Sequence, residues 1–379
     1  MNAARAIEWL LAVPGLVSIL YYGVAGKLLD RWRSRPAAGD GDEASWPPVT
    51  FFRPLKSGVP DLAAKLDALV QAARPGDQVL IGVEAGSPEA AAAEAVRLEN
   101  PGLEIVVVPC KPGGVSNPKV AKLLGMEPQA RHEHWILSDS EALVDAEFLT
   151  AFRREWRRCD VLTAGYRFRG MATWPQRLDA AAVLLGLWPG LAVLKAAGPL
   201  RLTLGACTGF RRADLQAIGG WAAFADDLAE DNRLGQALAD AGRDIRLCSH
   251  VVTLECDALS WRDYWRHQRR VAVTYRAANP AGFAGALLTQ GVTTSFLLAC
   301  WQITNGWAWS LCAAVFVMRW AMAHRMARAL NFNIPGLLPV VFVASAVETM
   351  CWALSWGTKR VWWSGKHRRI SFRGRFSNT

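Results

Sequence analysis

The sequence predicts a mostly parallel α/β sheet domain with transmembrane helices at both ends. Between residues 49 and 140, short apolar runs alternate with helical patterns, which indicates parallel strands joined by crossover helices. No charged residue lies within 9–26 or within 277–318, and both runs are long enough to cross a bilayer. Together these observations favour a membrane protein that carries one α/β domain.

Composition narrows the class of partner. The chain has 379 residues, of which 52% are hydrophobic, with 18 tryptophans and a net charge of +10. Such a chain favours a membrane surface or a nucleic acid as its partner. The cations gather at the ends of the apolar runs and no nucleic-acid-binding motif appears, so we expect a lipid bilayer and no nucleic acid. Eight cysteines without a CxxC pair indicate reduced thiols, with neither a disulfide framework nor a zinc site.

Residues 1–35 are predicted to form an N-terminal transmembrane helix and its basic flank. The uncharged run 9–26 is close to the minimum length of a span. The cations that follow it should stay in the cytoplasm. They are Lys27, Arg31, Arg33 and Arg35. A cleaved signal peptide is the alternative, because small residues lie at 23–26. Residues 36–45, PAAGDGDEAS, form a linker by composition.

Residues 277–328 are predicted to form a transmembrane hairpin. The uncharged stretch holds two crossings of about 20 residues each. The polar, glycine-containing segment QITNG, 302–306, is the natural turn. Arg276 precedes the uncharged stretch, and Arg319, Arg325 and Arg328 follow it. Both flanks are basic and therefore cytoplasmic, as is the segment between the first span and the hairpin.

Residues 329–358 are predicted to form a re-entrant or interfacial hairpin. Prolines and a glycine break the start of its apolar run, 334–356, and Glu348 lies inside it. Counting this run as a further span would place the basic tail, 359–379, outside, against the positive-inside bias. We therefore expect a cytoplasmic tail whose paired tryptophans lie at anionic lipid head groups. A plain fourth span remains the alternative.

Residues 46–276 are predicted to form a cytoplasmic catalytic domain. The expected strands are 49–52, 78–84, 103–109 and 134–140, and the expected helices are 59–73, 88–100 and one that follows Asn117-Pro118-Lys119. Sheets of this kind bind ligands beyond the carboxyl ends of their strands. The apolar segment 181–200 is either an interfacial helix pair or a buried core helix.

The fourth predicted strand, HWILSDS, runs into two acidic residues, Asp139 and Glu141. In an extended chain, side chains at i and i+2 point the same way. Two such carboxylates can share one divalent cation, with phosphate oxygens completing its coordination shell. An isolated DxE is more often a turn cap beside a solvated acid, so the reading depends on other charged residues at the same edge.

Three further segments supply such residues. Glu84 ends the second strand, and alone it would be a surface acid. Lys119 follows Asn-Pro and could meet a phosphate, although a lone lysine usually faces solvent. Glu230 and Asp231 open an amphipathic helix, where a carboxylate is usually a cap and can otherwise deprotonate an acceptor hydroxyl. The basic segment 264–276 is either a positive-inside flank or a diphosphate clamp.

In this order the motifs resemble those of inverting glycosyltransferases with a GT-A fold, most closely the ceramide glucosyltransferase family and the related hopanoid glycosyltransferases. FRPLKSGVPDL resembles the KPLKG loop of that family, and GGVSNPKVAKL resembles its G-x-NPKV loop. SDSE stands at the second acidic motif, GACTGFRRADLQAIGGW resembles the acceptor-side segment, and LAEDNRLGQALADAG resembles the third acidic motif. HQRRV occupies the place of (Q/R)xxRW. The resemblance covers nearly the whole chain.

The resemblance implies a role for each matching residue. Glu84 would lie near the uracil or ribose, and Lys119 near the nucleotide. Asp139 and Glu141 would hold the nucleotide through Mg or Mn. Asp231 would be the general base.

The last motif is implied to act on the leaving group. Arg270, with help from His267, Gln268 or Arg269, would neutralise the leaving UDP. The sequence departs from the family at Glu84, where the family has Asp, in DSE for DxD, and at Val271, where the family has Trp.

The expected enzyme is therefore an inverting UDP-sugar:lipid glycosyltransferase of the bacterial inner membrane, with its catalytic domain in the cytoplasm. Its acceptor would be a membrane lipid, with ceramide or another sphingolipid favoured and a hopanoid or another lipid alcohol as the alternative. A polysaccharide synthase and a membrane-anchored nucleic-acid binder are the readings from other classes.

Overall fold

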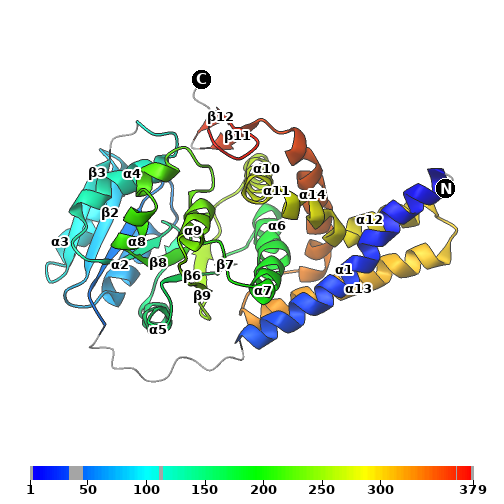
Figure 1. Ribbon diagram of the computed structural model, residues 1–379, viewed down its shortest axis with the longest axis horizontal. Coiled ribbons are helices and arrows are strands. Elements are labelled where there is room, and N and C mark those ends of the chain that lie inside the picture. Colours follow the sequence, from blue (N-terminus) through cyan, green and yellow to red (C-terminus); the bar gives the residue numbers. More distant parts are fainter. Residues whose placement is uncertain (1–2, 34–45, 111–113, 364, 377–379) are drawn as a thin grey trace. The chain divides into compact units, whose positions relative to one another are not determined.

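The computed structural model describes residues 3–33, 46–110, 114–363 and 365–376 (Figure 1). The chain divides into two compact units. The helical unit takes in the N-terminal helix, Arg169–Gly198 and Ala258–Gly374. Of the described residues, the α/β unit takes in 46–168, Pro199–Asp257 and 375–376. The predicted catalytic domain, 46–276, is divided between the two units, because 169–198 and 258–276 belong to the helical unit.

The α/β unit is built on a seven-stranded sheet in the order β3-β2-β1-β4-β8-β6-β9. Its strands are β1 (Val49–Pro54), β2 (Gln78–Glu84), β3 (Glu104–Cys110), β4 (His134–Ser138), β6 (Val161–Ala164), β8 (Cys207–Arg211) and β9 (Ile245–Leu247). Strands β3, β2, β1 and β4 pair in parallel, as do β6 and β9, whereas β8 runs antiparallel to both β4 and β6. A small second sheet joins β5 (Ala142–Leu143), β10 (Val252–Glu255) and β7 (Tyr166–Arg169). The predicted mostly parallel sheet is confirmed.

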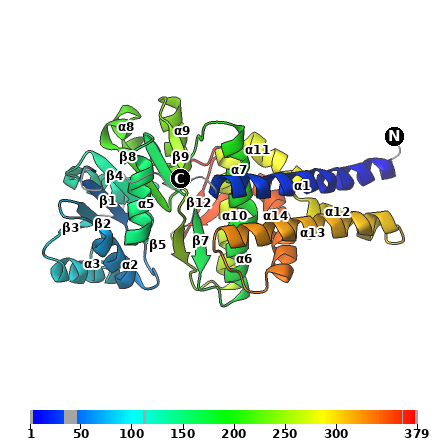
Figure 2. The same cartoon turned by 90° about the horizontal axis from the view of Figure 1, so that it is seen from below.

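Alternation along the strands buries both faces of the sheet. Phe51 belongs to an apolar cluster with residues of α2 (Leu62–Ala72), α3 (Pro88–Glu99) and α5 (Ala146–Trp156). Its neighbour Phe52 points the other way and packs against Trp135, with ring centroids 4.7 Å apart. On that other face α4 (Pro118–Met126) approaches β2 so closely that a Cβ on Gly82 would lie 2.5 Å from the sulfur of Met126. Helices therefore cover the sheet on both sides (Figure 2).

Local sequence fixes where the helices of this unit begin. Ser87 caps α3, since its side chain accepts from the amide of Ala90, and a proline follows at the first helical position. Asn117 caps α4 in the same way, again with a proline behind it. The remaining helical segments of the unit are η2 (Glu127–Gln129), α8 (Arg212–Ala217), η4 (Trp221–Phe224) and α9 (Glu230–Asp240).

The helical unit begins with α1 (Ala3–Arg33), which packs along α12 (Gly291–Trp301) and α13 (Gly306–Ala329). Its other helices are α6 (Trp174–Ala182), η3 (Val183–Leu187), α7 (Trp188–Ala197), α10 (Trp261–Ala278), α11 (Pro280–Gly285), η5 (Ala286–Thr289) and α14 (Leu337–Gly357). Strands β11 (Arg360–Trp363) and β12 (Lys366–Arg369) form an antiparallel ribbon. By length and composition, four helices of the described residues could cross a membrane: α1, α6 to α7, α13 and α14. The bent pair Pro280–Thr289 and Gly291–Trp301 would make a fifth.

Two predictions in this unit need correction. Residues 337–357 form one continuous helix where a helical hairpin was expected. Pro335 and Gly336 precede α14, and Pro339 lies in its first turn, where a missing N–H removes no helical hydrogen bond. The segment 181–200, expected to be an interfacial helix pair or a buried core helix, belongs to a helical run that begins earlier, at Trp174, and continues without a break through the π-helical turn η3. The expected turn at 302–306 does separate α12 from α13.

Candidate active site

The carboxyl end of β4 carries the first group of the candidate site. Asp139 follows the last strand residue directly, and its amide donates to the carbonyl of Gly205 at 3.2 Å. Asp139 forms an ion pair with Lys119, with Oδ1 2.7 Å from the lysine Nζ. The Lys119 ammonium also lies 2.9 Å from Oε1 of Glu230. Lys119 therefore joins an acid at the end of a strand to an acid at the start of α9.

Asn117 is the residue that fixes this lysine. Its side-chain oxygen caps α4 by accepting from the amides of Lys119 and Val120 at 2.9 and 3.2 Å. Its side-chain nitrogen donates to Glu230 Oε2 at 3.0 Å and to the carbonyl of Asp227 at 2.8 Å. Because Asn117 is fully buried and uses both ends of its amide, α4 and α9 are held in register around Lys119.

Asp231, the next residue of α9, also lies beside Gly205. Its Oδ2 accepts from the amide of Gly205 at 3.0 Å, and its Oδ1 accepts from the amide of Asn232 at 2.7 Å. A Cβ placed on Gly205 would lie 2.6 Å from Asp139 Oδ2 and 3.3 Å from Asp231 Oδ2. The two carboxylates thus approach the same side of Gly205, where an added Cβ would force Asp139 to move.

Burial and charge shift two pKa values in this cluster. Burial and the nearby charge of Glu230 raise the pKa of Asp231 to about 6, although Lys119 opposes the shift. For Lys119, burial acts to lower the pKa, but the carboxylates of Asp139 and Glu230 outweigh it and raise the pKa above its usual value. The lysine therefore stays charged, and Asp231 is a weaker acid than an ordinary aspartate.

The family model of Glycosyl transferase family 21 matches residues 9–376. The chain belongs to this family. It is therefore a glycosyltransferase, as the resemblance implied. No protein with a curated description matches the chain.

Solved structures of other glycosyltransferases are similar to this family 21 chain. The mannosyltransferase PcManGT from Pyrobaculum calidifontis, in complex with GDP-Man and Mn2+, has a TM-score of 0.55 at 19% identity, over 91% of this chain and 98% of that chain. TarS 1–349 from S. aureus, in complex with UDP-GlcNAc, has a TM-score of 0.36 at 13% identity, over 88% of this chain and 99% of that chain. The first likeness confirms the predicted GT-A-like fold.

The structure brings some of the predicted site residues together. Lys119 pairs with Asp139, and Asp231 lies nearby, beside Gly205. Glu141 lies two residues beyond Asp139 and forms an ion pair with Lys56, which also contacts Asp257 at 2.8 Å. Glu84 is exposed at the last position of β2, beyond the same edge of the sheet as Asp139.

The other four predicted residues belong to α10 of the helical unit. Gln268 donates to Asp179 Oδ1 at 2.7 Å, and His267 Nε2 lies 4.0 Å from the same oxygen. Arg269 donates to the hydroxyl of Thr358 at 3.4 Å, and the carbonyl of Arg270 accepts from Thr274. These four residues of the family 21 chain thus belong to the helical unit, whereas Asp139 and Asp231 belong to the α/β unit.

Sequence reasoning missed the cations other than Lys119 that surround the end of β4. Arg53, on β1, is fully buried and donates to the hydroxyl of Ser138 at 2.9 Å and to the carbonyl of Ser140 at 3.2 Å. Burial lowers its pKa to about 10. Lys56 follows β1 and holds Glu141. The motif RPLK at the end of the first predicted strand was the available signal for both.

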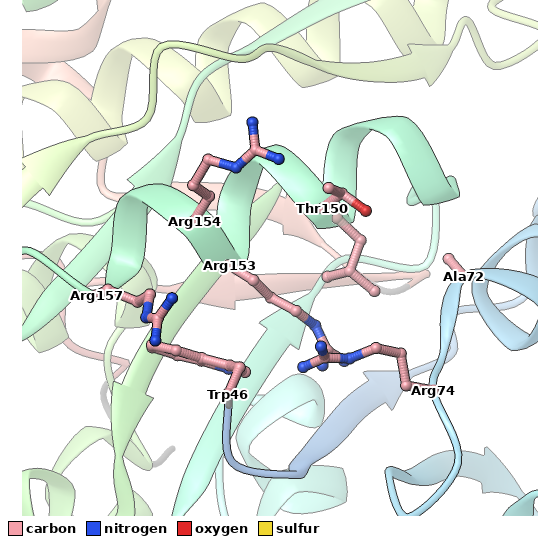
Figure 3. A pocket seen from close by; sticks show the side chains of 8 residues that line it. Trp46, Ala72, Arg74, Thr150, Arg153, Arg154 and Arg157 are labelled. Atoms are coloured by element: carbon pink, nitrogen blue, oxygen red, sulfur yellow. The ribbon is translucent and has the colours of Figure 1, made fainter. Parts of the chain in front are cut away.

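A basic hollow lies at the opposite end of the same strands. It is lined by Trp46, Ala72, Arg74, Leu149, Thr150, Arg153, Arg154 and Arg157 (Figure 3). Arg153 pairs with Asp77 at 2.5 Å, and Asp77 accepts from the amide of Val49, the first residue of β1. Since ligands of such sheets bind at the carboxyl ends of the strands, this hollow is not the glycosyltransferase site.

The acidic cluster suits a divalent cation. Asp139, Glu230 and Asp231 place three carboxyl groups around the single ammonium of Lys119, so the group has fewer cations than acids. Carboxylate oxygens are the donors that Mg2+ and Mn2+ prefer. The side chains of Asp139 and Glu141 keep 30% and 22% exposure, so both remain accessible to a cation.

Proposed function

We propose that this glycosyltransferase moves a sugar from a UDP-sugar to a hydroxyl group of a membrane lipid, with inversion, giving a β-glycolipid. Ceramide or another sphingolipid is the favoured acceptor. The observation that carries the proposal is the approach of Asp139 and Asp231 to the same side of Gly205 at the carboxyl ends of the strands. The family match and the candidate membrane-spanning helices support it.

The donor is proposed to bind beyond β2 and β4. The similar mannosyltransferase structure holds GDP-Man and Mn2+, which supports a nucleotide sugar and a divalent cation here. Asp139 and Glu141 would hold Mg2+ or Mn2+, which when bound would neutralise charge on the diphosphate. Glu84 is proposed to lie near the uracil or ribose, and Lys119 near the nucleotide.

Asp231 is proposed to be the general base. Its two oxygens are fixed by the amides of Gly205 and Asn232, so the carboxylate has one orientation. A pKa of about 6 leaves it ionised at neutral pH yet more basic than an ordinary aspartate. It accepts the proton of the acceptor hydroxyl while that oxygen bonds to the anomeric carbon, and the bond from this carbon to the UDP oxygen breaks.

Residues of α10 are proposed to act on the leaving UDP. Arg270 would neutralise its charge, helped by His267, Gln268 or Arg269. A lipid acceptor accounts for the helical unit, because the apolar tail of the acceptor then stays in the bilayer. We place the enzyme in a bacterial inner membrane with its α/β unit in the cytoplasm, as the basic flanks favour.

The test is transfer of radiolabel from a nucleotide sugar to extracted lipids by the purified chain. We expect label from a UDP-sugar in the organic phase, removed by a chelator and restored by Mg2+ or Mn2+. Parallel assays with UDP-glucose, UDP-N-acetylglucosamine and GDP-mannose identify the donor, and ceramide, hopanoid and diacylglycerol identify the acceptor. Label in an insoluble polymer would support a polysaccharide synthase, and no label in either phase would overturn the proposal.

A further inference from the structure

Glu155, Cys248 and His250 form a cluster in the α/β unit that the glycosyl transfer does not use. Glu155 lies near the end of α5, and the other two lie in the connection from β9 to β10. The ligand atoms of the three side chains all lie within 4.8 Å of one another. His250 Nδ1 is 3.1 Å from Glu155 Oε1, and Cys248 Sγ is 3.7 Å from the same oxygen.

The two separations from Glu155 Oε1, 3.1 and 3.7 Å, are close to those of ligands around one small metal ion, and the third pair lies within 4.8 Å. A tetrahedral zinc with bonds of about 2.0 to 2.3 Å keeps its ligand atoms roughly 3.3 to 3.8 Å apart. Thiolate and imidazole are ligands that favour zinc over Mg2+ or Mn2+. A thiolate and a carboxylate would also balance the two charges of Zn2+, so the loaded site would be neutral.

We propose that Glu155, Cys248 and His250 bind Zn2+, with an external ligand such as water at the fourth position. Cys248 is fully buried, whereas the side chain of His250 is 39% exposed, so the ion can enter from the solvent side of the histidine. The amide of Ser249 donates to Glu155 Oε2 at 2.9 Å, and the hydroxyl of Ser249 donates to Oε1, a hydrogen bond that the ion would replace.

The proposed ion would join chain segments more than ninety residues apart. Glu155 and Cys248 are separated by 93 positions. The amide of Cys248 donates to the carbonyl of Thr163, on β6, at 2.8 Å. The hydroxyl of Thr163 accepts from the amide of Leu204, the residue before Gly205, also at 2.8 Å. Zinc would therefore stabilise the hydrogen-bonded segments that lead from Cys248 through Thr163 to Leu204, without touching the donor. The inference does not rest on the proposed function.

The test measures metal on the full-length chain, purified in detergent without a polyhistidine tag. After exposure to stoichiometric Zn2+ and removal of free ion, we expect one zinc per chain by elemental mass spectrometry. Cys248→Ser and His250→Ala should lose this zinc. Cys159→Ser, a half-buried thiol in the same unit, and Asp139→Asn, in the acidic cluster, should keep it.

Two further measurements make the test decisive. Co2+ in place of zinc should give a thiolate-to-metal absorption band in the wild type that Cys248→Ser lacks. Zinc should raise the melting temperature of the wild type and not that of His250→Ala, a variant at an exposed position that serves if Cys248→Ser does not fold. A wild type that retains no zinc, or zinc retained by both ligand variants, would overturn the proposal.

Discussion

Two groups of charged side chains, one in each unit, are arranged differently. In the helical unit, Arg319 of α13 is almost fully buried and pairs with Glu348 of α14, while its other nitrogen donates to the hydroxyl of Tyr22 at 3.1 Å. In the α/β unit, Lys119 faces two acids directly and a third nearby. Arg319 and Glu348 balance each other and, with Tyr22, link three helices. At the end of β4 the three acids, Asp139, Glu230 and Asp231, outnumber the two cations beside them, Lys119 and Arg53.

The contrast between a balanced pair and a surplus of acids helps to separate structural charges from charges that bind a ligand. A balanced buried pair resists the loss of either member, because the remaining charge would have no partner. A surplus of carboxylates at the ends of parallel strands costs stability unless a cation joins it, and such a cost is typical of a binding or catalytic site. The four predictions below test this distinction.

The largest effect is expected from Asp231→Asn. An amide cannot accept the proton of the acceptor hydroxyl, so turnover should fall by about 10²- to 10⁴-fold. Binding of UDP should be nearly unchanged, because Asp231 is not proposed to touch the nucleotide. Asp240→Asn, at the exposed end of the same helix, is the matched control and should keep full activity. Wild-type turnover in Asp231→Asn would remove this residue from the role of base.

The next effect concerns stability in the helical unit. Arg319→Met leaves Glu348, whose side chain is 32% exposed, without its cation and should cost about 1 to 3 kcal/mol of unfolding free energy. If the pair is balanced and structural, the double variant Arg319→Met with Glu348→Leu should recover most of this loss. Thermal unfolding in detergent measures both. A double variant less stable than the single variant would mean that the pair does more than hold helices together.

A smaller effect is expected from Gly205→Ala. The added Cβ would lie 2.6 Å from Asp139 Oδ2, so this carboxylate must move. A displacement of about 1 Å at a reacting centre can cost about 10²-fold in rate. Gly102→Ala, where a Cβ meets no atom within 4 Å, is the control. Equal kcat/KM in the two variants would show that Asp139 and Asp231 need not meet as closely as they do here.

Gly205 also marks the limit of what the sequence could predict. The strands β1 to β4 were predictable because each is a short apolar run between turn signals, and their parallel order placed Glu84 and Asp139 at one edge. The role of Gly205 depends on two carboxylates far from it in the chain, and periodicity carries no such information. The same holds for β8, an antiparallel strand between β4 and β6.

The errors in the helical unit have a similar cause. Pro339 indicated a break because a proline inside a helix removes a hydrogen bond. In the first turn no such bond is lost, and the exact start of a helix is the feature that sequence predicts least well. Glu348 argued against a continuous apolar helix because the sequence does not show that it has a partner. That partner, Arg319, is 29 positions away in the chain. The proposed zinc ligands include only one cysteine. Cys248 and His250 are two positions apart, and Glu155 is far from both in the chain, so cysteine spacing alone gave no signal.

The smallest effect is expected from pH. Burial and Glu230 raise the pKa of Asp231 to about 6, so its basic form is lost as the pH falls through that value. The kcat/KM should therefore be level above the pKa and fall about tenfold per pH unit below it. Glu230→Gln removes one of the charges that raise the pKa, so the inflection should move to lower pH. A profile that is flat between about pH 5 and pH 8, or an inflection that Glu230→Gln leaves in place, would show that the surplus of acids does not tune the base.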